Sequence, residues 1–182
     1  MPPEDHLNSS PAEANSAGPP TTKENTTMGY TTSFEGQVAV EPPLNPTEIA
    51  YLRDFAESRR HQRPEGPYST HDYGYSELGH PAYNTPPEGQ PSLWCNWEPT
   101  DDGTGIRWNG AEKFYDATKW MQYLIDHFLK ADAAAKGQPG FEAFTFDHTV
   151  NGVIQAQGDD PADAWELLVL DNEAVGGGIH GY

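Results

Sequence analysis

Positive charge is scarce in this sequence. Ten Lys and Arg residues stand against 28 Asp and Glu residues, which gives a formal net charge of −18 over 182 residues. The field of such a chain repels polyanions, and this argues against direct binding to nucleic acid or to an anionic membrane. The same field attracts a basic partner, including a protein whose own ligand is nucleic acid.

Cysteine and long apolar runs are also nearly missing. Cys95 is the single cysteine, so the chain can hold neither an intramolecular disulfide framework nor a multi-cysteine zinc site. No apolar run approaches the roughly 20 residues of a membrane span, and the N-terminal residues 1–6 lack the charge and apolar block of a secretory signal. The seven histidines show no metal-ligand spacing. We therefore expect a soluble cytoplasmic protein without a metal, a cofactor or membrane contact.

Composition divides the chain into a tail, one domain and a short end. Residues 1–29 are rich in Pro, Ser, Thr and Asn, a composition that predicts a disordered tail. A single α+β domain is expected over residues 30–175, and residues 176–182 are expected to form a flexible C-terminal tail. A loop rich in Pro, Gly and Tyr interrupts the domain at residues 64–92. Its four tyrosines favour a loop that packs over the domain.

The longest apolar pattern predicts a central helix over residues 109–130. Apolar side chains recur there at spacings of three and four, which is the stripe of an amphipathic helix. The stripe consists of Phe114, Ala117, Met121, Leu124, Ile125 and Phe128. We expect the core of the domain to form against this helix.

The remaining segments predict strands and one further helix. Residues 34–41 alternate as a half-buried strand, and Asn45 with Glu48 forms a capping box that starts a helix. This helix is expected to end within residues 59–63, before Pro64. Hairpins are expected over residues 93–108 and 153–172. The predicted fold is α+β, with an antiparallel sheet of about five strands and two helices on one face. The order β-α-ββ-α-ββ favours a ferredoxin-like topology.

An arginine cluster and two tryptophans are the candidate ligand-binding residues. Three of the ten Lys and Arg residues lie close together in the sequence, at Arg59, Arg60 and Arg63. They can complement the end of the preceding helix, or they can clamp a phosphate or another anion through guanidinium forks. Trp94 and Trp108 lie on the predicted hairpin, where they can pack in the sheet or stack on a base.

Other polar residues favour structural roles, so no catalytic residue is proposed. Cys95 lies between two tryptophans on a strand and is interpreted as a small buried residue. The paired carboxylates Asp101-Asp102 and Asp159-Asp160 lie beside Gly or Pro, where Asp is favoured for local hydrogen bonding in turns. No EF-hand spacing is present.

In combination, six sequence motifs carry a resemblance to a known family. They are W-C-N-W (94–97), D-G-T-G-I-R-W-N-G (102–110), E-K-F-Y (112–115), W-M-Q-Y-L-I-D-H-F-L (120–129), N-G-V-I-Q-A-Q-G (151–158) and V-L-D-N-E-A-V (169–175). With these residues the chain resembles a widespread family of small acidic proteins from bacteria, prophages and phages. The resemblance covers residues 29–175 and implies a phage or prophage setting, without implying an activity.

Three functional hypotheses remain open on these observations. In the first, a non-enzymatic binding module engages a host protein through its acidic surface and interferes with a defence or nucleic-acid-handling protein in the bacterial host cytoplasm. In the second, Arg59, Arg60 and the hairpin tryptophans hold a small anionic ligand of the nucleotide type. In the third, the protein is an enzyme whose site is assembled only by the fold.

Overall fold

The computed structural model describes residues 30–71 and 81–176 of the chain. The predicted tail at residues 1–29 lies outside the described residues, and so does nearly all of the predicted tail at residues 176–182. Of the predicted loop at residues 64–92, the stretch 72–80 is also outside them.

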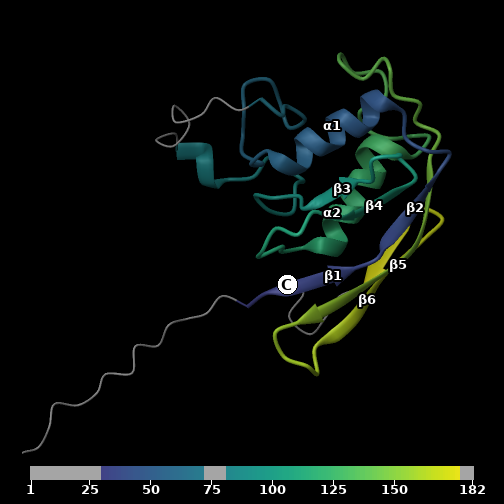
Figure 1. Cartoon of the computed structure of the whole chain (residues 1–182). Helices are drawn as coiled ribbons and strands as arrows, with labels where there is room; N and C mark the ends of the chain where they lie inside the picture. The colour runs from purple at the N-terminus through teal and green to yellow at the C-terminus, as the bar shows by residue number, and fades with distance from the viewer. Residues whose placement is uncertain (1–29, 72–80, 177–182) are drawn as a thin grey trace, which may run out of the picture.

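An antiparallel sheet and two α-helices make up the described fold (Figure 1). The strands are β1 (Thr32–Glu35), β2 (Gln37–Glu41), β3 (Trp97–Pro99), β4 (Gly105–Trp108), β5 (Thr149–Gly158), β6 (Ala164–Leu170) and β7 (Glu173–Gly176). The helical segments are α1 (Pro46–Glu57), the 3-10 turn η2 (Pro81–Asn84), α2 (Ala117–Leu124) and the π-helix η3 (Ile125–Leu129). The α+β class and the antiparallel sheet are confirmed. The predicted count of about five strands is wrong, because the sheet has seven.

The predicted first strand is split in two at Gly36. This residue has a φ of 97°, a backbone conformation that favours glycine, and it separates β1 from β2. Both pieces pair with the ten-residue strand β5, which lies beside β2 with its first half and beside β1 with its second half. The predicted alternation is nevertheless confirmed, since Phe34, Val38 and Val40 are all buried.

The seventh strand, β7, follows a tight turn at the end of β6. Asp171 and Asn172 both adopt positive φ in this turn, and Asx residues tolerate that conformation better than most side chains do. The strand order across the sheet is β3-β4-β2-β5-β6-β7. The chain therefore runs ββ-α-ββ-α-βββ, which differs from the predicted order at both ends.

The central helix is shorter than predicted but buries the predicted face. It begins at Ala117 because Gly110, Lys113 and Asp116 all have positive φ, which an α-helix does not accommodate. After Leu124 it continues as the π-helix η3. All six residues of the predicted apolar stripe are buried, including Leu124 at 2% exposure. The prediction of the core face is confirmed, and the prediction of the helix limits is wrong.

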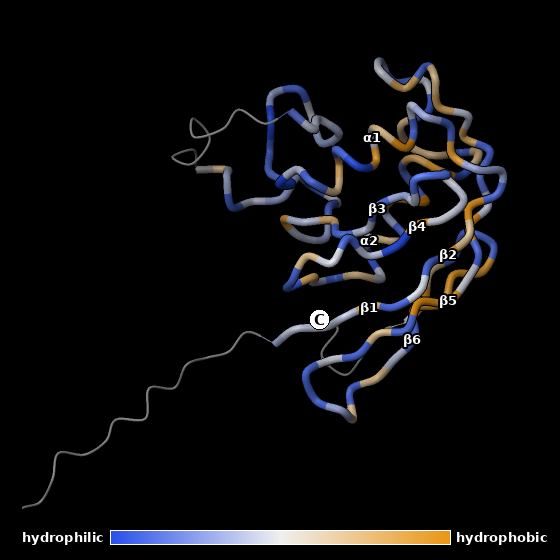
Figure 2. Tube along the Cα trace, viewed as in Figure 1, coloured by the Kyte–Doolittle hydropathy of each residue, from blue (hydrophilic) through white to orange (hydrophobic). Residues whose placement is uncertain are grey.

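The two faces of the sheet have different environments. Along β2, β5 and β6 buried residues alternate with exposed ones, and Figure 2 shows polar and apolar residues alternating along these strands. The inner face packs against α1, α2 and η3 in one core cluster. The outward-pointing residues of β2, β5 and β6 remain exposed, so we call this outer side of the sheet the open face.

The described parts of the loop at residues 64–92 pack over the helices. The Tyr68 ring lies 5.1 Å from that of Phe128 and 5.6 Å from that of Phe141, measured between centroids. The Tyr68 hydroxyl is also 2.7 Å from His127 Nδ1. These contacts agree with the interpretation of the tyrosines as residues of a covering loop.

Candidate functional site

Arg59 lies between two aromatic rings at the end of α1. The helix ends at Glu57, and the extended backbone of Ser58 turns the chain away, so the arginines follow the helix instead of lying on it. The Arg59 guanidinium carbon is 4.5 Å from the centroid of the Tyr83 ring and 5.8 Å from that of Trp94. These distances are typical of cation–π contacts.

Hydrogen bonds hold Arg59 in this position and leave part of its guanidinium available. Its Nε donates to the carbonyl of Tyr83 at 3.1 Å, and its Nη2 donates to Asn84 Oδ1 at 2.7 Å. Within residues 30–71 and 81–176, no carboxylate is paired with it. Trp94 is 40% exposed. A planar anion could therefore approach a cation and an indole at the same place.

Arg60 points the opposite way, into the protein. Its side chain is 1% exposed and its guanidinium carbon lies 4.2 Å from the centroid of the Phe55 ring. It donates hydrogen bonds to the carbonyl and hydroxyl of Ser58 and to the carbonyl of Ser69. Arg60 thus ties the end of α1 to the covering loop. It cannot share a surface site with Arg59.

Burial makes Arg60 less basic than an exposed arginine. Desolvation is the main cause, the charge of Arg63 adds to it, and together they lower the pKa of Arg60 to about 10. The guanidinium therefore remains charged at neutral pH. Its Nη1 and the Oε1 of Gln90 are buried without a hydrogen-bond partner in the described part of the chain. Gln90 donates through Nε2 to Pro67 O and Tyr123 Oη, so this residue joins two stretches of the covering loop to α2.

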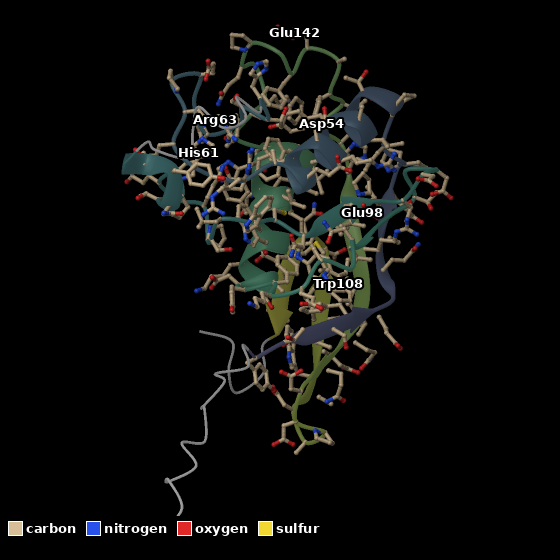
Figure 3. All side chains as sticks on the ribbon, turned by 60° about the vertical axis from the view of Figure 1, so that its left-hand side comes forward. Asp54, His61, Arg63, Glu98, Trp108 and Glu142 are labelled. Atoms are coloured by element: carbon tan, nitrogen blue, oxygen red, sulfur yellow. The ribbon has the colours of Figure 1, made fainter. Side chains whose placement is uncertain are left out.

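The remaining predicted site residues are divided between two regions. Arg63 donates through Nη1 to the carbonyl of Arg59 at 2.9 Å, and the buried His61 ring lies 5.3 Å from that of Tyr83. Figure 3 shows Arg63 and His61 near one another and Trp108 well apart from both.

Trp108 packs against the aromatic core. Its ring is 5.7 Å from that of Phe34, and its Nε1 donates to the carbonyl of Ala111. Trp97, directly opposite on β3, is fully buried. The structure thus brings Arg59 and Trp94 together, and it corrects the grouping of Trp108 and Arg60 with them. Tyr83 and Asn84 were missed, because no periodicity in the loop indicated that η2 would contact Arg59.

Glu48 and His148 form a buried ion pair. Glu48 Oε2 is 3.2 Å from His148 Nε2, and both side chains are 1% exposed. The Glu48 carboxylate also accepts from the backbone of Asn45 and Thr145, and His148 Nδ1 lies 2.7 Å from the carbonyl of Pro42. The confirmed capping box of α1 is thus joined to the segment that precedes β5.

The hydrogen bonds of this pair set the direction of each pKa. Burial by itself would raise the pKa of Glu48, but bonds from His148, Thr145 and Asn45 outweigh it and lower the pKa. Burial by itself would lower the pKa of His148, but Glu48 and the Pro42 carbonyl outweigh it and raise the pKa. Both groups are therefore stabilised in their charged forms.

The geometry of this pair is not that of a nucleophile and its base. Thr145 Oγ1 lies 3.0 Å from His148 Nε2, and Glu48 faces that same nitrogen. In a Ser-His-Asp arrangement the acid and the nucleophile bond to different ring nitrogens. Cys95 is likewise unsuited to nucleophilic attack, because it is fully buried and burial raises the pKa of its thiol to about 12.

The open face of the sheet carries a second candidate site that was not predicted from the sequence. Exposed apolar side chains gather on β5, β6 and β7, namely Val153, Leu168, Leu170 and Val175. The available signal was the stretch Leu167–Leu170, in which four consecutive apolar residues leave no polar residue for the outer face.

Neither the described residues nor a comparison with other proteins assigns a further site or a family to this chain. Within residues 30–71 and 81–176, no three His, Cys, Asp or Glu side chains are grouped in a way that could hold a metal ion. No helix in the described part of the chain is long and apolar enough to cross a membrane. No protein-family model, curated protein or solved structure matches this chain.

Proposed function

We propose that the chain is a phage or prophage accessory protein that acts in the bacterial cytoplasm as a non-enzymatic binding module. Its acidic surface engages a basic host protein of the defence or nucleic-acid-handling kind. The observation that carries this proposal is the distribution of charge. No Lys or Arg follows Lys136, whereas eight Asp and Glu residues do, so β5, β6, β7 and their turns carry negative charge alone. Such a surface accelerates encounter with a basic protein.

The pairing of the basic side chains supports the same proposal. Four surface cations are bound to carboxylates of the chain itself: Arg53 to Asp101, Arg107 to Glu98, Lys119 to Asp116 and Lys130 to Asp126. Arg60 is buried. The described residues hold nine Lys and Arg side chains against 22 Asp and Glu side chains, so a basic partner would find acidic groups that are not yet neutralised.

Capture from a bacterial lysate tests this proposal. Tagged wild-type chain is compared with a variant in which Glu35, Glu166 and Glu173 are all changed to Gln. We expect the wild-type chain to retain a basic protein at low salt and to release it at high salt, because screening weakens attraction between exposed charges. The variant should retain much less of that protein. Retention that is equal for both chains, or insensitive to salt, would contradict the proposal.

A second candidate function rests on Arg59. Its guanidinium lies between Tyr83 and the exposed Trp94 without a carboxylate partner among the described residues. In a chain with almost three carboxylates for each cation, this isolation favours a role in holding an anion. A nucleotide would place its phosphate on the guanidinium and its base against the indole.

Calorimetric titration with nucleotides and cyclic dinucleotides tests this second candidate. We expect binding by the wild-type chain and loss of binding in Arg59→Ala and in Trp94→Ala, both of which remove partly exposed side chains. Lys119→Ala is the matched control, since it removes a cation elsewhere on the surface. Absence of any heat of binding for the wild-type chain at millimolar ligand would exclude the candidate.

We also infer a ferredoxin-like arrangement for the first part of the sheet. The support is the order β3-β4-β2-β5, which places the first strand between the third and fourth strands of a βαββαβ unit once β1 and β2 are counted as one strand. Strands β6 and β7 then extend this unit at one side. The arrangement concerns architecture and carries no function by itself.

A further inference from the structure

Three of the exposed apolar side chains on the open face form a single row across three strands. Val153 on β5 is paired with Leu168 on β6, and Leu168 is paired with Val175 on β7. Their exposed fractions are 40%, 39% and 55%, and Leu170, one row further along β6, is 61% exposed. Directly paired side chains on one face of a sheet lie within contact distance. These four residues, which we call the apolar row, therefore form one continuous patch.

Carboxylates border the apolar row on both sides. Glu173 is paired with Leu170 at one end. In the neighbouring row on the other side, Gln155 is paired with Glu35 on β1 and with Glu166 on β6. All of these polar side chains are on the exposed side of their strands. An outward-facing strand position is ordinarily polar, so an apolar row with an acidic border marks a surface of contact.

The basic side chain nearest to the apolar row on this face is already paired with a carboxylate. Arg107 lies on β4, separated from β5 by β2, and its Nε is 3.3 Å from Glu98 Oε1. Among the described residues of β1, β2, β5, β6 and β7, no Lys or Arg is present. The border of the apolar row is thus uniformly negative.

The neighbouring edge of the sheet is closed, so a partner must approach the face. The backbone N–H of Ala174 donates to Gln122 Oε1 at 2.7 Å, and Thr118 Oγ1 donates to the carbonyl of Gly176 at 3.2 Å. Both side chains belong to α2, and both bonds occupy backbone groups of β7 on the edge that faces away from β6. Addition of a further strand beside β7 would have to displace them.

We propose that the apolar row with its acidic border is the docking surface for a basic amphipathic segment of the partner protein. Apolar side chains of the segment cover Val153, Leu168, Leu170 and Val175, and its Lys or Arg side chains meet the bordering carboxylates. This inference rests on the proposed function, since it assigns the acidic module a place of contact and a class of partner. A second copy of this chain fits less well, because both copies would bring the same carboxylates together.

The experiment measures dissociation constants of the full chain by fluorescence anisotropy with two labelled peptides. One peptide, the Lys–Leu peptide, is a sequence that as a helix presents a stripe of Leu with Lys along both sides. The other, the Lys–Ser peptide, has Ser in place of every Leu and has the same length and charge. We expect the Lys–Leu peptide to bind more tightly than the Lys–Ser peptide, and both to weaken as salt is added.

Three variants locate the contact. The triple variant Val153→Thr, Leu168→Thr and Val175→Thr keeps residues that suit strands but removes the apolar surface. We expect it to weaken binding of the Lys–Leu peptide by about tenfold or more and to leave binding of the Lys–Ser peptide unchanged. The variant Glu166→Gln should weaken both peptides. Tyr115→Thr, which removes an exposed aromatic residue before α2, is the matched control and should change neither.

Each contrary result has a distinct meaning. If the triple variant binds the Lys–Leu peptide as the wild-type chain does while Glu166→Gln weakens it, the docking surface is wrong and the proposed function stands. If the wild-type chain binds neither peptide, both proposals fail. If sedimentation shows that the wild-type chain dimerises at high salt and the triple variant does not, the occupant is a second copy, and the inference is overturned. Thermal unfolding of every variant verifies that the fold is retained.

Discussion

At the scale of single residues, the Glu48–His148 pair couples the start of α1 to the approach to β5. The pair is almost completely buried, and its bonds include three that join segments far apart in the sequence: Glu48 to His148, Glu48 to the backbone of Thr145, and His148 to the carbonyl of Pro42. A buried ion pair adds little stability in comparison with an apolar replacement, but removal of one member leaves the other charge without compensation. The pair therefore makes the stability of this region dependent on pH.

The first prediction concerns that dependence. The lowered pKa of Glu48 contributes stability above its ordinary value of 4.5 and loses that contribution as the pH falls through the folded value. The raised pKa of His148 contributes stability below its ordinary value of 6.5 and loses it as the pH rises through the folded value. The difference in unfolding free energy between the wild-type chain and Glu48→Gln should therefore be largest in the window between these two ordinary values.

We expect that difference to reach about 3–5 kcal/mol, the cost of breaking a buried pair. Denaturant unfolding at a series of pH values measures it. Glu57→Gln, at the exposed end of the same helix, is the control and should change stability by less than about 0.5 kcal/mol at every pH. A difference for Glu48→Gln that stays constant across the series would mean that neither Glu48 nor His148 has a shifted pKa in the folded protein.

The second prediction separates two neighbouring arginines. Arg60→Lys should destabilise the protein by about 2 kcal/mol or more, because a lysine cannot reproduce the planar set of buried hydrogen bonds to Ser58 and Ser69. Arg59→Lys should cost less than about 0.5 kcal/mol, since its side chain is partly exposed. Thermal unfolding measures both changes. Equal losses for the two variants would show that their different orientations have no energetic consequence.

At the scale of secondary-structure elements, α2 and η3 provide the inner layer of the core. Trp120, Met121, Leu124, Ile125 and Phe128 are at most 2% exposed. The third prediction follows from this burial: Leu124→Ala should cost about 2–5 kcal/mol, through lost transfer energy and a residual cavity. Denaturant unfolding measures the loss. The control Lys119→Ala, on the exposed side of the helix, should have a much smaller effect, and a similar loss for both would place the core elsewhere.

The sequence predicts the buried faces of these elements better than their ends. Phe114 and Ala117 belong to the same apolar stripe, but only Ala117 is helical, because Asp116 between them adopts a positive φ. Apolar periodicity in a sequence indicates which side chains are buried, but it does not indicate where the helical or strand backbone begins and ends. The split at Gly36 has the same origin, since β1 and β2 keep one alternation across the interruption.

The candidate sites could be predicted only in part. The Arg59 and Trp94 side chains come together because α1 ends beside the segment that leads into β3, and the backbone of Arg60 bonds to the carbonyl of Leu93 there. The sequence placed Trp94 and Trp108 on one predicted hairpin, but it could not indicate that Trp108 lies against Phe34, because that contact depends on the order of strands. The apolar row depends on strand register in the same way.

At the scale of the whole molecule, the net charge of −18 opposes compact folding through repulsion among the carboxylates. The fourth prediction is that added sodium chloride raises the melting temperature. The Debye length falls from about 30 Å at 0.01 M salt to about 10 Å at 0.1 M, so repulsion between distant carboxylates is screened over this range. A thermal scan at increasing salt measures the shift. A melting temperature that falls with salt would mean that the surface ion pairs outweigh the repulsion.

The position of β5 has a consequence for synthesis of the protein. Residues 32–41 leave the ribosome long before residues 149–158, which form β5, the strand that pairs with both β1 and β2. Until β5 emerges, Val38 and Val40 lie on a strand without that neighbour, and the inner face of the sheet cannot close over the helices. The nascent chain must therefore remain unfolded, or be held by a chaperone, until β5 has emerged. A chain that is truncated before residue 149 should therefore not fold as a smaller functional domain, and proteases should degrade it.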